Sequence, residues 1–220
     1  MEYFLYPKIP LWSHIDYMAK KLCINSQNQE MERLKELIGQ AEELACPKCV
    51  YRPEFIEKRG PDFLEFKGYK LKSKILQSKT QETNRVFAFV ASCGNELYDW
   101  VYKKTDYVDQ YYGQTILEKT LRETTLSLQY EIQERFNISQ LSQLQPGSLE
   151  DWPIQEQGTI FNLLENGSKQ IGVSLTSSLL MIPPQSLSGL FFHTQEPYVS
   201  CQLCPIKDCP DRQALYQGKI

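Results

Sequence analysis

A short apolar run at residues 85–92, RVFAFVAS, sets the tightest limit on how this chain can fold. A run of this length, made mostly of apolar residues, indicates a central β-strand that is buried on both faces. Helical patterns lie on either side of it in the chain. Residues 28–45 carry apolar side chains at helical spacing, and residues 95–104 and 106–136 are also predicted to be helical, the last with no internal proline. Gly113 is the one weak point of this long segment.

Turn-forming residues and prolines predict the other strands. Residues 50–56 and 63–71 have the composition of strands, and the intervening GPD at residues 60–62 indicates a reversal that joins them as an antiparallel pair. Pro53 restricts the first strand to a sheet edge, because proline cannot donate to a strand ladder. The elements expected farther along are a loop at 145–153, a short helix at 154–164, a turn at Asn166-Gly167 and a strand at 188–193.

Strands and helices are mixed along the chain without a strict βαβ alternation, so the sequence favours an α+β fold over a doubly wound sheet. At 220 residues the chain can bury one good core, and we expect a single domain over residues 1–220. Only two histidines occur, and no convincing nucleophile–histidine–acid set, metal-protease motif or phosphate loop is present. No independent catalytic residue is therefore predicted.

Charge and hydropathy argue against two classes of partner, nucleic acids and membranes. The formal net charge is −3 and the pI is about 5.6, whereas sequence-independent nucleic-acid binding relies on clustered lysine and arginine. The densest basic group, at residues 67–79, is interrupted by other residues and is interpreted as a solvated face. No apolar run approaches the roughly 18–20 residues that cross a bilayer. The N-terminal MEYFLYPKIPLWSH lacks the basic and apolar regions of a signal peptide, so we expect a cytoplasmic protein.

The most informative segment for function runs from Pro146 to Gly189. Its motifs are, in order, PG at 146–147, DWP at 151–153, IGVSLT at 171–176, MIP at 181–183 and SLSG at 186–189. This order resembles the reactivation domain of cobalamin-dependent methionine synthase, in a short stand-alone form. The resemblance extends over nearly the whole chain.

The resemblance implies both a fold and a function. The fold would be a single α+β domain with a curved, twisted antiparallel sheet flanked by helices. The activity would be the reductive reactivation of a cobalamin-dependent methyltransferase, methionine synthase above all. In that reaction a reductant protein supplies an electron, and the domain positions S-adenosylmethionine so that cob(I)alamin is methylated. Because 220 residues leave no room for substrate and cobalamin domains, a partner corrinoid protein would carry the cobalamin.

The resemblance also implies residues that bind S-adenosylmethionine. Glu118 matches a carboxylate that binds the cationic part of the ligand. Gly147 matches a glycine whose backbone lies against the ligand, a close approach that the absence of a Cβ permits. Tyr198 falls where the family has a tyrosine that contacts the ligand.

The ligand-binding loop departs from the family pattern, which usually reads Arg-x-x-Pro-Gly-Tyr. Here Gln143 stands in place of the arginine and Ser148 in place of the tyrosine, on either side of Pro146 and Gly147. Gln143 can donate a hydrogen bond but lacks the positive charge that would bind a ligand carboxylate. Gln185 also stands where relatives often have lysine. These positions remain candidates for ligand binding, with altered chemistry.

The cysteines give a separate chemical signal. The candidate metal ligands are Cys46, Cys49, Cys201, Cys204 and Cys209, the last three in a Cys-rich segment at residues 201–212. Cysteines in a cytosolic chain are more often reduced or metal-bound than disulfide-bonded. Three local thiolates plus one from the other pair would complete an iron–sulfur cluster or zinc site, which usually takes four ligands. The alternative is a set of reduced cysteines at the C-terminal edge.

Two other functions remain open from the sequence. The substitutions Gln143 and Ser148 are consistent with a binding or adaptor module that has kept the fold and lost the ligand. The C-terminal cysteines are consistent with an iron–sulfur electron carrier that serves a corrinoid protein.

Overall fold

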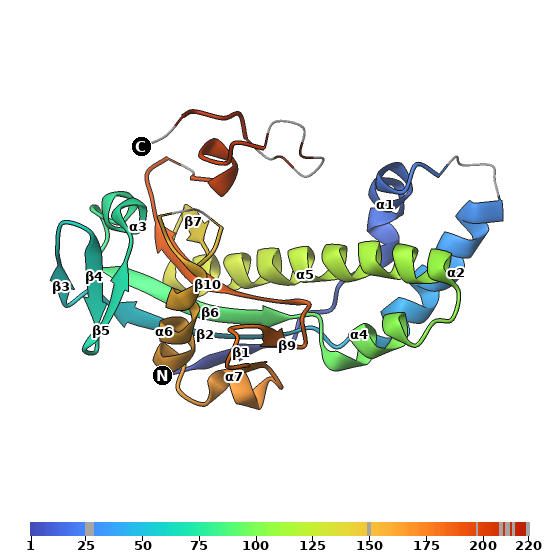
Figure 1. The fold of residues 1–220 in the computed structure, drawn as a ribbon, viewed down its shortest axis with the longest axis horizontal. Helices are drawn as coiled ribbons and strands as arrows, with labels where there is room; N and C mark the ends of the chain where they lie inside the picture. Colours follow the sequence, from blue (N-terminus) through green and yellow to red (C-terminus); the bar gives the residue numbers. More distant parts are fainter. Residues whose placement is uncertain are drawn as a thin grey trace.

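The computed structural model describes residues 1–24, 29–148, 151–196, 198–206, 209, 212 and 214–218. Within these ranges the chain forms a five-stranded sheet and two smaller sheets, with helices on both faces of the main sheet (Figure 1). The predicted α+β fold, an antiparallel sheet flanked by helices, is confirmed. No helix in the described part of the chain is long and apolar enough to cross a membrane.

The main sheet has the strand order β1-β2-β6-β10-β7, and every neighbouring pair is antiparallel. Its strands, in chain order, are β1 Tyr3–Leu5, β2 Lys48–Phe55, β6 Arg85–Ser92, β7 Leu141–Leu144 and β10 Ser186–His193. The strand predicted at residues 85–92 is therefore confirmed. Val90 of β6 pairs with Val50 on one side and with Ser188 on the other, so β6 is the central strand.

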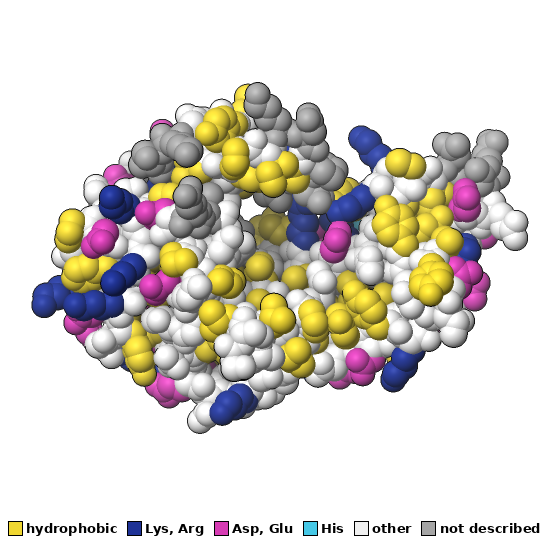
Figure 2. Space-filling model, viewed as in Figure 1, with side chains coloured by type: hydrophobic (Ala, Val, Ile, Leu, Met, Phe, Trp, Pro, Cys, Tyr) yellow, Lys and Arg dark blue, Asp and Glu magenta, His cyan; other side chains and the backbone are white. Residues whose placement is uncertain are grey.

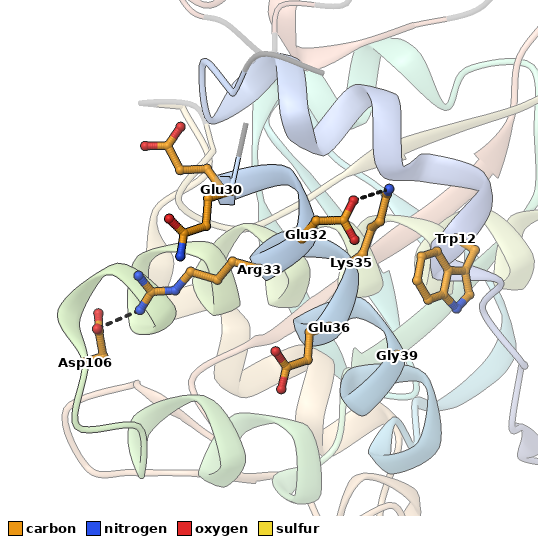
Figure 3. A pocket seen from close by; sticks show the side chains of 9 residues that line it. Trp12, Glu30, Glu32, Arg33, Lys35, Glu36, Gly39 and Asp106 are labelled. Carbon is orange, nitrogen blue, oxygen red and sulfur yellow. Dashed lines mark hydrogen bonds and ion pairs between the residues drawn. The ribbon is translucent and has the colours of Figure 1, made fainter. Parts of the chain in front are cut away.

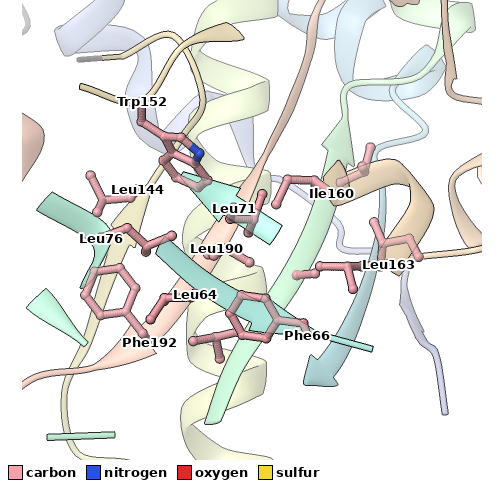
Figure 4. Packing of buried hydrophobic residues seen from close by; sticks show 14 of the residues in the cluster. Leu64, Phe66, Leu71, Leu76, Leu144, Trp152, Ile160, Leu163, Leu190 and Phe192 are labelled. Carbon is pink, nitrogen blue, oxygen red and sulfur yellow. The ribbon is translucent and has the colours of Figure 1, made fainter. Parts of the chain in front are cut away.

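Side chains of β6 alternate between two apolar layers, as a strand buried on both faces requires. The odd-numbered residues 87–91 lie in a layer covered by the long helix α5 (Tyr107–Phe136). The even-numbered residues 86–90 lie in a layer covered by α6 (Gln157–Leu163) and by a three-stranded sheet. Figure 4 shows this second layer, whose members include Leu64, Phe66, Leu71, Leu144, Trp152, Ile160, Leu190 and Phe192.

Smaller elements complete these layers and extend the molecule at one end. The three-stranded sheet and the helix after it are β3 Lys58–Arg59, β4 Phe63–Phe66, β5 Tyr69–Lys72 and α3 Lys74–Lys79. Three helices pack with the N-terminal part of α5 beyond the sheet (Figure 1): α1 Ile15–Lys21, α2 Gln29–Leu44 and α4 Asn95–Tyr102. The remaining elements are the 3-10 helices Leu11–His14, Ile154–Glu156 and Ser200–Gln202, the helix α7 Gly167–Gln170, and the paired strands β8 Ser174–Leu175 and β9 Met181–Ile182.

The ends and the single glycine of α5 are explained by local chemistry. The Asp106 side chain caps the N-terminus and accepts a hydrogen bond from the Val108 amide at 2.7 Å. Asn137 ends the helix in the left-handed conformation, with φ of 51°. Gly113 lies against α4, and a Cβ there would come within 2.9 Å of the Val101 side chain. The expected weak point is therefore the place where two helices approach closely.

Several details of the predicted strands and turns were wrong. β2 is an internal strand, although Pro53 was expected to restrict it to an edge. The three-residue β1 pairs only with residues 49–51, so Pro53 lies beyond β1 and needs to pair only with Phe87 of β6. The reversal at residues 60–62 joins β3 to β4 rather than β2 to β4.

The segment at residues 63–71 is a hairpin and not one strand. Lys67 and Gly68 have positive φ values of 48° and 79°, which give a tight two-residue turn between β4 and β5. The turn expected at Asn166-Gly167 also differs, because Gly167 begins the short helix α7.

Candidate functional site

A surface groove of about 570 Å³ lies between α5, the edge strand β7 and the segment that follows β10. Residues of α1 and of the start of β10 also contribute to it. Its lining includes the side chains of Lys21, Glu118, Arg122, Gln143, Tyr198 and Cys201. In Figure 2 the molecule is hollowed between the C-terminal segment and the body beneath it.

One face of α5 forms the wall of this groove. The lining residues of α5 recur every three or four positions, from Thr115 to Gln129, and therefore lie on one side of the helix. Another side of α5 packs on the sheet through Leu128 and Ile132. Gln129 Nε2 donates to the Leu141 carbonyl oxygen at 3.2 Å, so the helix is hydrogen-bonded directly to β7.

Tyr198 closes the groove on the side of β7. Its amide donates to Ser142 Oγ at 2.8 Å, and Ser142 Oγ is 2.6 Å from Thr194 Oγ1. Lys79 Nζ lies 5.0 Å from the centroid of the Tyr198 ring, which is a cation–π contact. Tyr198 is only 6% exposed, and this burial raises the pKa of its hydroxyl to about 12, although the nearby Ser200 acts in the opposite direction.

Arg212 holds the C-terminal segment together. Its guanidinium donates to main-chain carbonyl oxygens of Cys201, Cys204, Ile206 and Ala214. A planar guanidinium with five N–H donors can serve several carbonyls at once. The Gln217 amide also donates to the Gln202 carbonyl oxygen at 2.7 Å. The described part of this segment from Cys201 onward is thus organised largely around one side chain.

Two of the three basic side chains that line the groove form ion pairs with carboxylates among the described residues. Lys21 Nζ lies 2.7 Å from Glu118 Oε2, and Lys119 Nζ lies 2.6 Å from Glu123 Oε1. Arg122 makes no ion pair or hydrogen bond within the part of the chain that the structure describes. Because the described lining includes three cations and one carboxylate, the groove is locally basic in a chain of net charge −3.

Two buried polar atoms of the groove lack hydrogen-bond partners among the described residues. They are Gln143 Nε2 and Tyr198 Oη. Ser200 lies near the Tyr198 hydroxyl without completing a hydrogen bond of good geometry. Buried polar groups in proteins are nearly always hydrogen-bonded, so these atoms mark positions where polar groups of a ligand or ordered water would be stabilised.

Three of the residues implied by the resemblance, Glu118, Gln143 and Tyr198, lie in this one groove, and Cys201 and Gln185 lie there too. Sequence reasoning missed Lys21 and Arg122. Arg122 follows Glu118 by one helical turn, so the sequence alone could have indicated that both lie on the same face of the helix. The contact between Lys21 and Glu118 spans 97 positions, and no local pattern reveals it.

Pro146, Gly147 and Ser148 form a turn beside the groove and do not line it. Gly147 has a positive φ of 81°, and its amide donates to the Trp152 carbonyl oxygen at 2.7 Å. Ser148 Oγ donates to the Gln145 carbonyl oxygen at 2.7 Å. The structure accounts for these residues as a turn, and their contact with a ligand stays a prediction.

The candidate metal ligands do not gather into a site. Cys49 is buried in β2, where its Sγ lies 3.8 Å from the Thr124 carbonyl oxygen, whereas Cys46 is exposed after α2. Cys201 belongs to the groove lining. Among the described residues there is no group of three or more histidine, cysteine, aspartate or glutamate side chains that could hold a metal ion. The iron–sulfur or zinc hypothesis therefore has no donor set in this part of the chain.

Thiol reactivity will distinguish these cysteines. Burial raises the pKa of Cys49 far above its ordinary value and that of Cys93 to about 12, so neither thiol forms the reactive thiolate near pH 8. We expect an aromatic disulfide reagent to label exposed Cys46 in the native protein, and Cys49 and Cys93 only at the rate of unfolding. Peptide mapping after timed labelling measures this. Rapid native labelling of Cys49 would contradict its burial in β2.

A larger and more open hollow, of about 1230 Å³, lies along α2 (Figure 3). Charged side chains line it, and several already pair with one another. Arg33 Nη2 lies 2.7 Å from Asp106 Oδ2, and Lys35 Nζ lies 2.7 Å from Glu32 Oε1. None of its described lining side chains has a buried polar atom without a partner. It has the character of a solvated surface rather than of a binding site.

Comparison with known proteins supports the fold. No protein-family model matches the chain, and no curated protein matches it. Among solved structures, a match is the "Crystal Structure of the MetH Reactivation Domain bound to AdoHcy". The two share 19% identity and a TM-score of 0.62, over 90% of this chain and 80% of that one. The chain therefore has the fold of that reactivation domain, as the resemblance predicted.

Proposed function

We propose that this chain, which has the fold of a methionine synthase reactivation domain, is an accessory subunit for the reductive reactivation of a cobalamin-dependent methyltransferase. The groove would bind S-adenosylmethionine and present its methyl group to a corrinoid on a partner protein, and a separate protein would supply the electron. One observation carries the proposal: Glu118, Gln143 and Tyr198 meet in one groove of a fold whose solved counterpart contains AdoHcy.

The chemistry of the lining residues fits this ligand. S-adenosylmethionine carries two cationic groups, a sulfonium and an ammonium, together with one carboxylate. Glu118 supplies a negative charge for the cationic part, and its present partner Lys21 lies on a different helix and can exchange with a ligand. Polar groups of the ligand would satisfy Gln143 Nε2 and Tyr198 Oη, which are buried without partners in the described structure.

The protein's contribution in this proposal is positioning. When bound, S-adenosylmethionine would supply an electrophilic methyl group on its sulfonium. Glu118 on the helical wall would fix the cationic end, and residues 198–201 would limit the access of water from the opposite side. No side chain is assigned a proton transfer, in keeping with the absence of a predicted catalytic residue.

Titration calorimetry tests the ligand. We expect the wild-type chain to bind S-adenosylmethionine with one-to-one saturation, and Glu118→Gln to bind about 10-fold more weakly or worse, because a charged hydrogen-bond partner contributes about 1.5–3 kcal/mol. Glu131→Gln is the matched control, since Glu131 lies on the same helix, pairs with Arg135 and is absent from the groove lining. No heat from the wild type at millimolar ligand would overturn the proposal.

An adaptor that binds the corrinoid protein without S-adenosylmethionine is the second candidate, favoured by Gln143 and Ser148 in the loop. A pull-down with the host's corrinoid methyltransferases in the cob(II) state separates the two functions when it is combined with calorimetry. Association without ligand binding supports the adaptor. Absence of any association overturns both functions.

A further inference from the structure

We propose that Arg122 and Gln143 together form a carboxylate-binding subsite in the groove, and that it binds the carboxylate of the ligand's amino-acid moiety. The identity of the ligand rests on the proposed function. The position of the subsite rests on the geometry of this chain. Arg122 is not among the residues that the family resemblance implies.

Arg122 is the lining cation that has no carboxylate partner in the described part of the chain. The other two lining cations, Lys21 and Lys119, pair with Glu118 and Glu123 respectively. Arg122 is half-buried on the groove wall, and its guanidinium makes no ion pair or hydrogen bond there. A guanidinium presents five N–H donors in a planar fork that matches the two oxygens of a carboxylate.

Strand and helix spacing bring Gln143 to the same part of the groove. Only residues 137–140 separate α5 from β7, so β7 returns antiparallel to the helix, and the Gln129–Leu141 hydrogen bond at 3.2 Å fixes their relative level. Two strand residues advance about 7 Å, and the same distance along a helix takes between four and five residues at about 1.5 Å each. Gln143 therefore lies beside the helical turn next to the one that carries Arg122.

Both side chains offer hydrogen-bond donors to the groove. Gln143 Nε2 is a buried donor without a partner among the described residues, and Arg122 adds charged donors from the other side of the groove. The guanidinium of Arg122 has donors and no acceptor, so it favours an anionic group and disfavours a cation, and Gln143 can add a donor to the same group. Glu118 lies one helical turn before Arg122, at a Cβ separation of about 5–6 Å. This pair of opposite charges matches the ammonium and carboxylate of an amino acid.

Decarboxylated S-adenosylmethionine provides the test, because it keeps the sulfonium and the ammonium and lacks only the carboxylate. Calorimetry would compare it with S-adenosylmethionine on the full chain and on Arg122→Gln, Arg122→Lys and Gln143→Leu. We expect Arg122→Gln to weaken S-adenosylmethionine binding by about 10- to 100-fold and to change binding of the decarboxylated compound by less than about twofold. Arg122→Lys would be intermediate, because an ammonium keeps the charge but not the fork.

Arg135→Gln is the matched control, an arginine on the same helix outside the groove, and it should leave both affinities unchanged. A wild-type chain that binds S-adenosylmethionine with an affinity independent of Arg122 would overturn the subsite and leave the proposed function standing. Equal losses for both compounds in Arg122→Gln would also overturn the subsite. A wild-type chain that binds neither compound would overturn the proposed function and the subsite with it.

Discussion

Gly189→Ala will lower the free energy of unfolding by about 2–3 kcal/mol, an effect typical of an overpacked interior. Gly189 lies in β10 opposite Phe89, where the neighbouring strand β7 passes close to it. A Cβ at this position would lie 2.4 Å from the Leu144 carbonyl oxygen and 3.1 Å from Phe89 Cε1. Because the first of these atoms belongs to the backbone of β7, it cannot move aside as the end of a flexible side chain can.

Urea denaturation followed by far-UV circular dichroism measures this effect, and Gly158→Ala is the matched control. Gly158 lies in α6, and a Cβ there would meet nothing within 4 Å. The control should therefore be neutral or more stable by up to about 1 kcal/mol, because alanine favours the helix. If both variants had the same stability, the close approach of β7 to Gly189 would be contradicted.

The same substitution connects the fold to the groove. β7 pairs with β10 from Leu141 to Leu144, and it carries Gln143 into the groove. Displacement of β7 by a methyl group at residue 189 would move Gln143 relative to α5. We therefore expect Gly189→Ala, if it folds, to lose ligand affinity as well as stability, because β7 both packs against residue 189 and carries Gln143.

Local patterns predicted the elements that carry their own signal. The apolar run RVFAFVAS became β6 with the predicted bounds, and the proline-free segment became α5 with Asp106 as its cap. In both cases the signal lies in residues close together in the sequence: a continuous apolar run for β6, and a capping aspartate followed by a proline-free segment for α5. The edge strands β1 and β7 were not predicted, because each has only three or four residues and gains its stability from a partner strand.

The candidate site was predictable only in part, for the same physical reason. The resemblance implied Glu118, Gln143 and Tyr198, which lie far apart in the sequence and meet in the groove through tertiary packing. Periodicity could have indicated Arg122, one turn beyond Glu118 on the same helix face. It could not indicate Lys21, whose position depends on how α1 packs against α5.

Arg212→Ala will disorganise the C-terminal segment after Tyr198 while leaving the main sheet folded. The substitution removes every hydrogen bond that the guanidinium donates to the carbonyl oxygens of Cys201, Cys204, Ile206 and Ala214. Each hydrogen bond from a charged donor contributes about 1.5–3 kcal/mol where it is shielded from water, and these bonds join parts of the segment to one another rather than to the sheet. Cys201 would then lose its fixed place in the groove wall, whereas Tyr198 stays held by Ser142 and by its burial in the core.

Hydrogen exchange read by mass spectrometry gives the measurement. Amides of residues 199–206 and 214–217, including the Gln217 amide that donates to Gln202, should lose protection in Arg212→Ala, whereas β6 amides and the Tyr198 amide should keep theirs. Arg212→Lys should resemble the alanine variant, because one ammonium cannot span four carbonyl oxygens. Under the proposed function, S-adenosylmethionine binding should weaken in both variants, because the wall that contains Cys201 loses its fixed position. A lysine variant with wild-type protection would show that positive charge alone, and not the guanidinium fork, organises the segment.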